Sequence, residues 1–121
     1  YGSASTFRAS NNSTANSLTL FCGLPEERFD TEYSQYVVGA GSGAQSNQVG
    51  IGFNSTSAVT GYSTIITTVA GVPQHQSHNA KYVAPPTIGF NVLTSLEISN
   101  GAASTFYGTE ARMLLSAKWR G

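Results

Sequence analysis

The sequence predicts an all-β fold, an antiparallel β-sandwich or jelly roll of about seven to nine strands. Three observations lead to this prediction. Short apolar segments are separated by Gly, Pro and Asn turn signals, two segments alternate with a period of two, and no 3.6-residue period persists. The length of 121 residues suits one domain, so we expect residues 1–121 to form a single sandwich. The Ser/Thr/Asn-rich stretch 1–16 is either a linker or a first edge strand.

The first predicted strands are short and end at Gly and Pro. Residues 17–22 form an apolar run that predicts a strand, and residues 32–38 predict the next because they are aromatic and β-branched. The alternation over residues 48–54 predicts a third strand. Its glycines, Gly50 and Gly52, share one face, where a neighbouring backbone can approach closely.

The clearest strand signal lies in the second half of the chain. Residues 62–69 predict a strand, and the polar stretch 74–79 predicts a loop. Residues 88–98 then predict a long, half-buried strand, because every second residue is apolar or Thr. We expect this set to face the core: Ile88, Phe90, Val92, Thr94, Leu96 and Ile98. The dipeptide at 100–101, Asn-Gly, predicts a hairpin to the following strand.

The final strand is predicted over residues 111–119. A helix is the alternative, because Ala, Arg, Met and Leu are good helix formers, but the unbroken period of two favours a strand. The apolar face of this strand consists of Ala111, Met113, Leu115, Ala117 and Trp119. On the opposite, outer sides of their strands, Leu93 and Leu114 interrupt the polar alternation. We expect these two residues at subunit contacts or beneath loops.

The composition restricts the classes of partner. Charged residues make up 10% of the chain, far below the roughly 25% of a typical soluble domain, so hydroxyls and amides must cover most of the surface. Six basic and six acidic residues give a net charge of zero, without the basic stripe that nucleic-acid binding needs. No apolar run approaches the ~20 residues of a membrane span, so we expect no membrane insertion. The lone Cys22 is expected to be buried as a small apolar residue.

Polar and aromatic residues near predicted turns are candidates for ligand or receptor contact. His75 and His78 lie in the predicted loop, which Asn79 ends. Tyr62 and Tyr82 lie beside polar turns, and tyrosine offers a flat apolar face with a polar tip. The two histidines are also the candidate metal ligands, in one chain or on a trimer axis. Without a nearby Cys or carboxylate they form a poor isolated zinc site, so we expect no metal and no cofactor.

No catalytic motif is present, so we expect a non-enzymatic domain. The chain has no nucleophile elbow on a strand-to-helix turn and no phosphate-binding Gly-rich loop. The acidic residues Glu26, Glu27, Asp30 and Glu32 predict a solvated or salt-bridged face. A subunit contact, a calcium site and the carboxylate pair of a glycosidase are the alternatives for this cluster.

Several stretches of the chain resemble C-terminal domains of bacteriophage fibre and tail proteins. They are residues 18–27 with 33–36, residues 49–58, the long strand that ends at Glu97, and residues 119–121. The resemblance implies a β-structured, trimeric fibre-tip or head-fibre domain, on the outside of the virion, that attaches to a host-surface receptor or glycan. It supplies no catalytic residue. One alternative is a lectin-like, carbohydrate-binding module of a cellular or secreted protein, and another is a hydrolase of surface polysaccharide.

Overall fold

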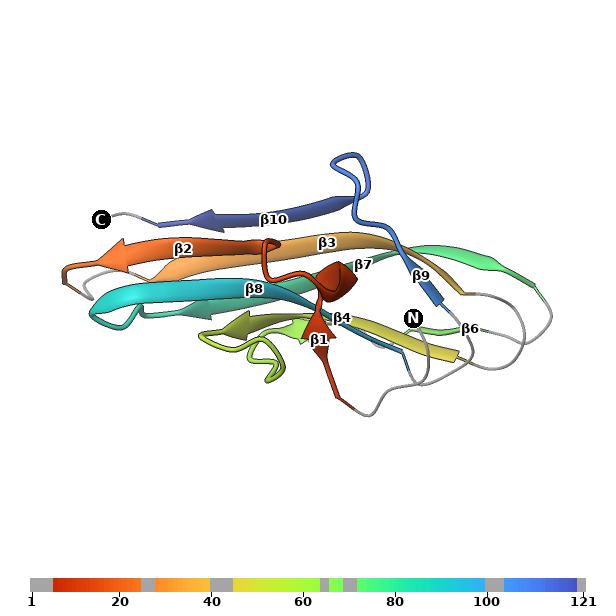
Figure 1. The fold of residues 1–121 in the computed structure, drawn as a ribbon, viewed down its shortest axis with the longest axis horizontal. Helices are drawn as coiled ribbons and strands as arrows, with labels where there is room; N and C mark the ends of the chain where they lie inside the picture. The colour runs from red at the N-terminus through yellow and green to blue at the C-terminus, as the bar shows by residue number, and fades with distance from the viewer. Residues whose placement is uncertain are drawn as a thin grey trace.

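The computed structural model of the chain describes residues 6–24, 28–39, 45–63, 66–68, 72–99 and 104–119. These residues form two antiparallel sheets that pack against each other, which confirms the predicted all-β sandwich (Figure 1). A short 3-10 turn, η1 (Ser10–Asn12), follows the first strand. The strands in chain order are β1 (Arg8–Ala9), β2 (Ser17–Cys22), β3 (Phe29–Gly39), β4 (Gln45–Phe53), β5 (Tyr62–Ser63), β6 (Ile66–Thr68), β7 (Gln74–Ala84), β8 (Gly89–Ser99), β9 (Ser104–Phe106) and β10 (Met113–Lys118).

The chain crosses repeatedly between the two sheets. Sheet A has the order β1-β8-β4-β6, with β2 also paired to β8, and sheet B has the order β10-β3-β7-β5, with β9 also paired to β3. From β2 to β9 each strand therefore lies in the opposite sheet from the strand before it, which is the winding of a jelly roll. The long strands β3, β7 and β8 run along the longest axis of the molecule (Figure 1).

The hydrophobic core lies between the sheets, on the inward positions of the long strands. Along β3 every second residue from Phe29 to Gly39 is buried, as a period of two requires. The buried cluster consists of Phe29, Tyr33, Val37, Val49, Ile51, Ala80, Leu93 and Phe106. The apolar face predicted for the final strand packs against this cluster through Met113, Leu115, Ala117 and Trp119. The final element is thus a strand and not the alternative helix.

The predicted inner face of the long strand β8 is wrong. Leu93 is completely buried in the core, whereas Phe90 is 71% exposed on the opposite face. The expected position of Leu93 on the outer side is therefore wrong as well. A period of two separates the two faces of a strand but does not say which one meets the partner sheet. The apolar outer set includes Leu96, which is buried beside Gly52 of β4.

The inner face of β8 is polar at one end because a buried hydrogen-bond network lies there. Glu97 is completely buried, and its Oε1 accepts hydrogen bonds from Arg8 Nε at 3.0 Å and Nη2 at 2.7 Å. The Tyr33 hydroxyl lies 2.7 Å from Ser10 Oγ and donates to Gln35 Oε1 at 2.6 Å. Buried polar groups need such partners, so this network replaces apolar packing at that end of the interior.

Other boundaries also differ from the predictions. The predicted loop 74–79 is the first half of β7, which pairs with β3 along its whole length. The predicted strand 62–69 is two short strands, since β5 pairs in sheet B and β6 in sheet A. The strand after residues 100–103, β9, pairs with β3 and not with β8, so the predicted hairpin pairing is wrong, while its turn lies outside the described residues. Residues 8–9 pair with β8 as an edge strand.

The two glycines of β4 share one face, as predicted, and this is the outer face of the strand, where Phe7, Ser55 and Val59 cover them. A Cβ added at Gly52 would overlap the carbonyl oxygen of Ser55, so backbone does approach closely there. A Cβ at Gly50 would meet side chains instead, Val59 Cγ2 at 2.5 Å and Phe7 Cε1 at 3.3 Å. This cover buries part of the outer face of sheet A and leaves the outer face of sheet B open.

Candidate functional site

Only some of the predicted site residues lie on the outer face of sheet B, the face that points away from sheet A. His75 and Asn79 are exposed on the outer side of β7, whereas His78 is 1% exposed and faces the interior. Residues three positions apart in a strand point to opposite sides, so one chain cannot use both histidines for one metal. The burial of His78 also contradicts its predicted role in ligand contact. Among the described residues no group of three or more His, Cys, Asp or Glu side chains is placed to hold a metal ion.

Of the two predicted tyrosines, Tyr82 does not lie on this open face. Tyr82 points inward, and its ring centroid is 5.8 Å from that of Phe29 and 5.9 Å from that of Phe53. It was predicted as a surface contact because polar turns flank it, but its position in β7 places it at the margin of the core. Tyr62 begins β5, and its side chain lies outside the part of the structure that is described.

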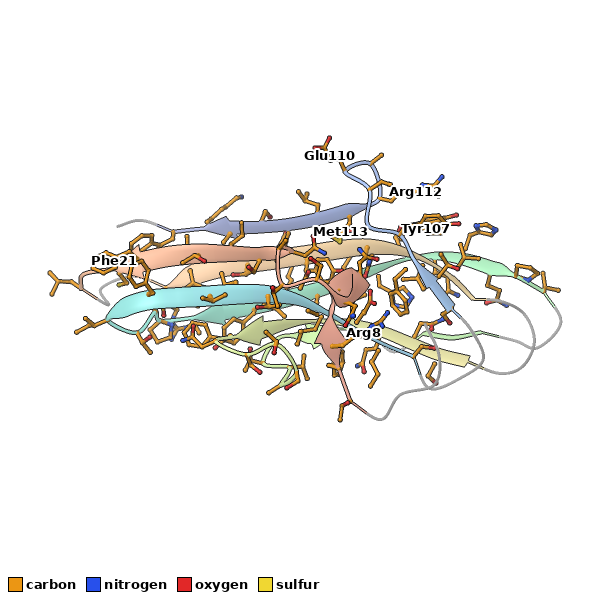
Figure 2. The ribbon with its side chains drawn as sticks, in the orientation of Figure 1. Arg8, Phe21, Tyr107, Glu110, Arg112 and Met113 are labelled. Atoms are coloured by element: carbon orange, nitrogen blue, oxygen red, sulfur yellow. The ribbon has the colours of Figure 1, made fainter. Side chains whose placement is uncertain are left out.

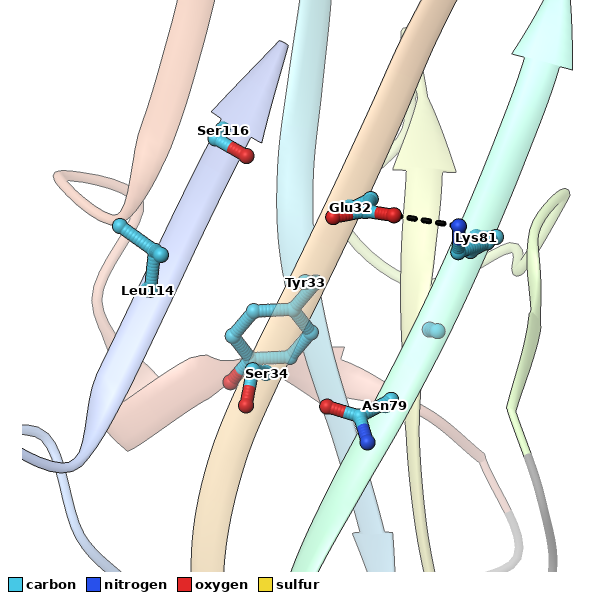
Figure 3. Close-up of a pocket in the computed structure, with 8 residues that line it drawn as sticks. Glu32, Tyr33, Ser34, Asn79, Lys81, Leu114 and Ser116 are labelled. Carbon is cyan, nitrogen blue, oxygen red and sulfur yellow. Dashed lines mark ion pairs between the residues drawn. The ribbon is translucent and has the colours of Figure 1, made fainter.

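A shallow hollow occupies the middle of the outer face of sheet B. Its volume is about 310 Å³, and three neighbouring strands line it (Figure 3). β10 contributes Leu114, which is 63% exposed, and β3 contributes Ser34 at the register position opposite Leu114. Asn79 of β7 is in turn the register partner of Ser34. The full lining is Glu32, Tyr33, Ser34, Asn79, Ala80, Lys81, Leu114 and Ser116.

The charges along one side of the hollow compensate each other. Glu32 and Lys81 are cross-strand partners and form an ion pair (Figure 3). Hydrogen bonding and charge attraction from Lys81 lower the pKa of the Glu32 carboxyl, and the same interactions raise the pKa of Lys81. Asp30, two residues before Glu32 in β3, is the cross-strand partner of Lys118 in β10. The hollow therefore has little net charge, and it combines a mainly apolar surface with hydroxyl and amide groups.

A partly exposed aromatic cluster lies beside the hollow, at the β9 end of β3. We call Tyr36, His75, Tyr107 and Arg112 the aromatic platform. The Tyr36 hydroxyl lies 2.5 Å from His75 Nδ1, and its ring centroid is 5.5 Å from that of Tyr107. The Arg112 guanidinium carbon lies 4.5 Å from the Tyr107 ring centroid and 5.3 Å from that of Tyr36. Cation–π attraction of this kind holds the guanidinium over both rings.

Backbone hydrogen bonds fix the aromatic platform in place. The Tyr36 N–H donates to the Arg112 carbonyl at 2.8 Å, and the Tyr36 carbonyl accepts from the Tyr107 N–H at 3.1 Å. The turn before β10 is closed by bonds from the N–H groups of Arg112 and Met113 to the Thr109 carbonyl, at 2.8 and 2.9 Å. The backbone of Tyr36 in β3 thus holds both Tyr107 and Arg112 beside it. Such preorganisation lowers the entropy that a binding site loses when it takes a ligand.

The acidic cluster predicted from the sequence is only partly described. Asp30 and Glu32 lie on the same outer side of β3, beside the hollow, and both face lysines of neighbouring strands. Glu26 and Glu27 lie outside the described residues. The free Cys22 is buried, as predicted, and its Sγ donates to the Leu24 carbonyl at 3.1 Å.

Sequence reasoning missed most of the aromatic platform. Tyr36, Tyr107 and Arg112 come from different strands and a turn, and only the antiparallel pairing of β9 and β10 with β3 brings them together. The available signal was their residue type, since exposed Tyr and Arg are the usual anchors of recognition surfaces. Figure 2 places Tyr107 and Arg112 near the turn before β10, far along the molecule from Phe21 of sheet A.

Comparisons with known proteins give no further guidance to this site. No protein-family model, curated protein or solved structure matches the chain. Within the described part of the chain, no helix has the length and apolar character needed to cross a membrane.

Proposed function

We propose that this domain is a non-enzymatic attachment module that binds a saccharide on the outer face of sheet B. The observation that carries the proposal is the aromatic platform beside a hollow that combines apolar surface with hydroxyl and amide groups. Aromatic rings offer flat apolar surfaces to the C–H faces of sugar rings, while nearby hydroxyls and amides bond the sugar hydroxyls. Ser34, Asn79 and Ser116 supply such groups, and Leu114 adds an apolar contact.

The setting we propose for this module is the tip of a virion fibre or a head fibre, facing the host surface. The low charge and the abundance of Ser, Thr, Asn and Gly support this proposal, together with the resemblance of the sequence to bacteriophage fibre and tail proteins. In this setting the receptor is a glycan of the host surface. The domain acts there by holding a ligand and performs no chemical step.

We further propose that the domain assembles as a homotrimer. A group of apolar side chains on the outer face of sheet A is available for contact between copies, since Phe21 and Phe90 form an edge-to-face pair and are 61% and 71% exposed. Ile88, one residue before β8, is 70% exposed. A net charge of zero leaves no long-range repulsion between copies. Leu114, which we expect at a subunit contact, is also exposed, and it lines the hollow of sheet B.

A lectin-like module of a cellular or secreted protein is the alternative. It is favoured by one observation: a single chain supplies every residue of the hollow and of the aromatic platform. Size-exclusion chromatography with light scattering separates the two. A monomer at micromolar concentration refutes the trimer and favours the lectin-like module, whereas a trimer supports the fibre domain.

The saccharide proposal is tested by a glycan array. Three proteins are compared: the wild type, Tyr107→Ala, and Val72→Ala as a control at an exposed apolar residue outside the platform and the hollow. We expect the wild type and Val72→Ala to retain the same glycans. Tyr107→Ala should weaken binding at least about tenfold, since a central aromatic anchor contributes roughly 2 kcal/mol. Absence of any retained glycan, or loss of binding only in Val72→Ala, refutes the proposal.

A further inference from the structure

The aromatic platform carries one positive charge, that of Arg112, with which no described carboxylate pairs. The Arg8 guanidinium pairs with Glu97, and Lys81 pairs with Glu32. Among the described residues no carboxylate forms an ion pair with Arg112, and its guanidinium donates no hydrogen bond to them. Its only partners there are the faces of Tyr36 and Tyr107.

Stacking on the two rings fixes the orientation of the Arg112 guanidinium but leaves its N–H groups available to donate hydrogen bonds. Cation–π contact engages the flat faces of the guanidinium and the ring, whereas the N–H groups point outward in the guanidinium plane. A planar fork of N–H donors matches the two oxygens of a carboxylate in a bidentate pair. Arg112 is exposed, and a hydrogen bond fixes its backbone to Tyr36. Its guanidinium N–H groups are therefore accessible to a carboxylate of a ligand.

We propose that the saccharide bound on this face is acidic, with a sugar carboxylate that Arg112 binds. This inference rests on the proposed saccharide-binding function and names its ligand class. Leu114 of the hollow lies two residues beyond Arg112, so the chain separates the two by at most roughly 7 Å. A carboxylate on one sugar at Arg112 thus places the adjoining sugar over the hollow, beside its uncharged hydroxyl and amide groups.

An acidic saccharide fits this face better than a nucleic acid or an acidic peptide does. A nucleic acid needs several cations to neutralise successive phosphates, but the neighbouring Lys81 is already paired with Glu32. An acidic peptide would use the charge of Arg112 but gives no reason for half-exposed rings beside a hollow lined by Ser34, Asn79 and Ser116. A sugar acid uses both, since it has a carboxylate together with C–H faces and hydroxyls.

The test compares acidic and neutral saccharides of equal length on the intact domain. The probes are oligosaccharides of galacturonic acid and of galactose, and the proteins are the wild type, Arg112→Gln, Arg112→Lys and the control Lys118→Gln. We expect the wild type to prefer the acidic probe by at least tenfold at low salt, with the preference shrinking as ionic strength rises. Arg112→Gln should reduce the preference, measured as the ratio of the affinities for the acidic and the neutral probe, below twofold. Arg112→Lys should keep part of the preference, and Lys118→Gln all of it.

The outcomes separate this inference from the function on which it rests. Equal affinity of the wild type for both probes, or a preference that survives in Arg112→Gln, overturns the acidic ligand but leaves saccharide binding intact. Binding of acidic peptides or of single-stranded DNA as tightly as the acidic saccharide also overturns it. If the wild type retains no saccharide of either kind on these probes or on the array, the proposed function fails and the inference fails with it.

Discussion

Replacing Leu93 and Leu114 by alanine tests which side of each strand meets the core. Each leucine interrupts the polar side of its own strand in the sequence, yet Leu93 is completely buried and Leu114 is 63% exposed. Truncation of Leu93 removes about three buried carbon groups at ~0.8 kcal/mol each, or about 2.4 kcal/mol of transfer free energy. The cavity that remains raises the expected loss to about 3 kcal/mol, within the range measured for buried leucines. Leu114, already mostly in water, should lose less than about 1 kcal/mol.

The assay is equilibrium unfolding in urea, followed by tryptophan fluorescence of Trp119 and by far-ultraviolet circular dichroism. At a typical slope of about 2 kcal/mol per molar urea, Leu93→Ala should lower the midpoint by about 1.5 M. Leu114→Ala should change it by less than about 0.5 M. Coincident transitions in both probes are the control that unfolding is two-state. Equal losses for the two variants, or a larger loss for Leu114→Ala, would refute the assignment of inner and outer faces.

Three further predictions concern backbone fit and the buried network. Gly52→Ala should cost roughly 1–3 kcal/mol of unfolding free energy because its Cβ meets the Ser55 carbonyl, whereas Gly23→Ala, with open space around it, should change stability by less than about 0.5 kcal/mol in the same urea titration. Asn54 has a φ of 51° and its Oδ1 accepts from a backbone N–H of β8 at 2.7 Å, so Asn54→Ala should cost about 1–2 kcal/mol and Asn54→Gly less. Burial raises the pKa of Tyr33, so its contribution is complete below the unfolded-state pKa of about 10 and declines at higher pH by about 1.4 kcal/mol per pH unit. Tyr33→Phe should flatten that part of the stability curve, and an unchanged slope would contradict the prediction.

The strands themselves were largely predictable from the sequence, because alternation is a local property. Residues 17–22 form β2 with the predicted bounds, and residues 88–98 differ from β8 by one position at each end. The side that faces inward was not predictable for β8, since part of its apolar outer set is buried by contacts from elsewhere in the chain. Leu96 lies buried beside Gly52 of β4, while Phe90 stays exposed. A polar inner face around Glu97 is stable only because Arg8 reaches it from β1. Contacts of this kind are invisible in a local pattern.

The error at residues 74–79 has a related cause. This stretch is polar on both sides, so composition indicated a loop, but its backbone hydrogen bonds are satisfied by pairing with β3. His78 then turns inward and His75 outward. Of the predicted contact residues, His75 and Asn79 do lie on the open face, yet the aromatic platform around Tyr36 required the register of sheet B, which no single segment encodes.

The most direct test of the binding face is a two-dimensional ¹⁵N–¹H titration of the labelled domain with the best glycan from the array. Saccharide contact at the aromatic platform predicts that the largest amide shifts fall on Tyr36, Tyr107 and Arg112, with smaller shifts at Ser34 and Asn79 and none along β2. Shifts concentrated on the outer face of sheet A, or no saturable shift at any amide, would contradict the assignment of the ligand to sheet B.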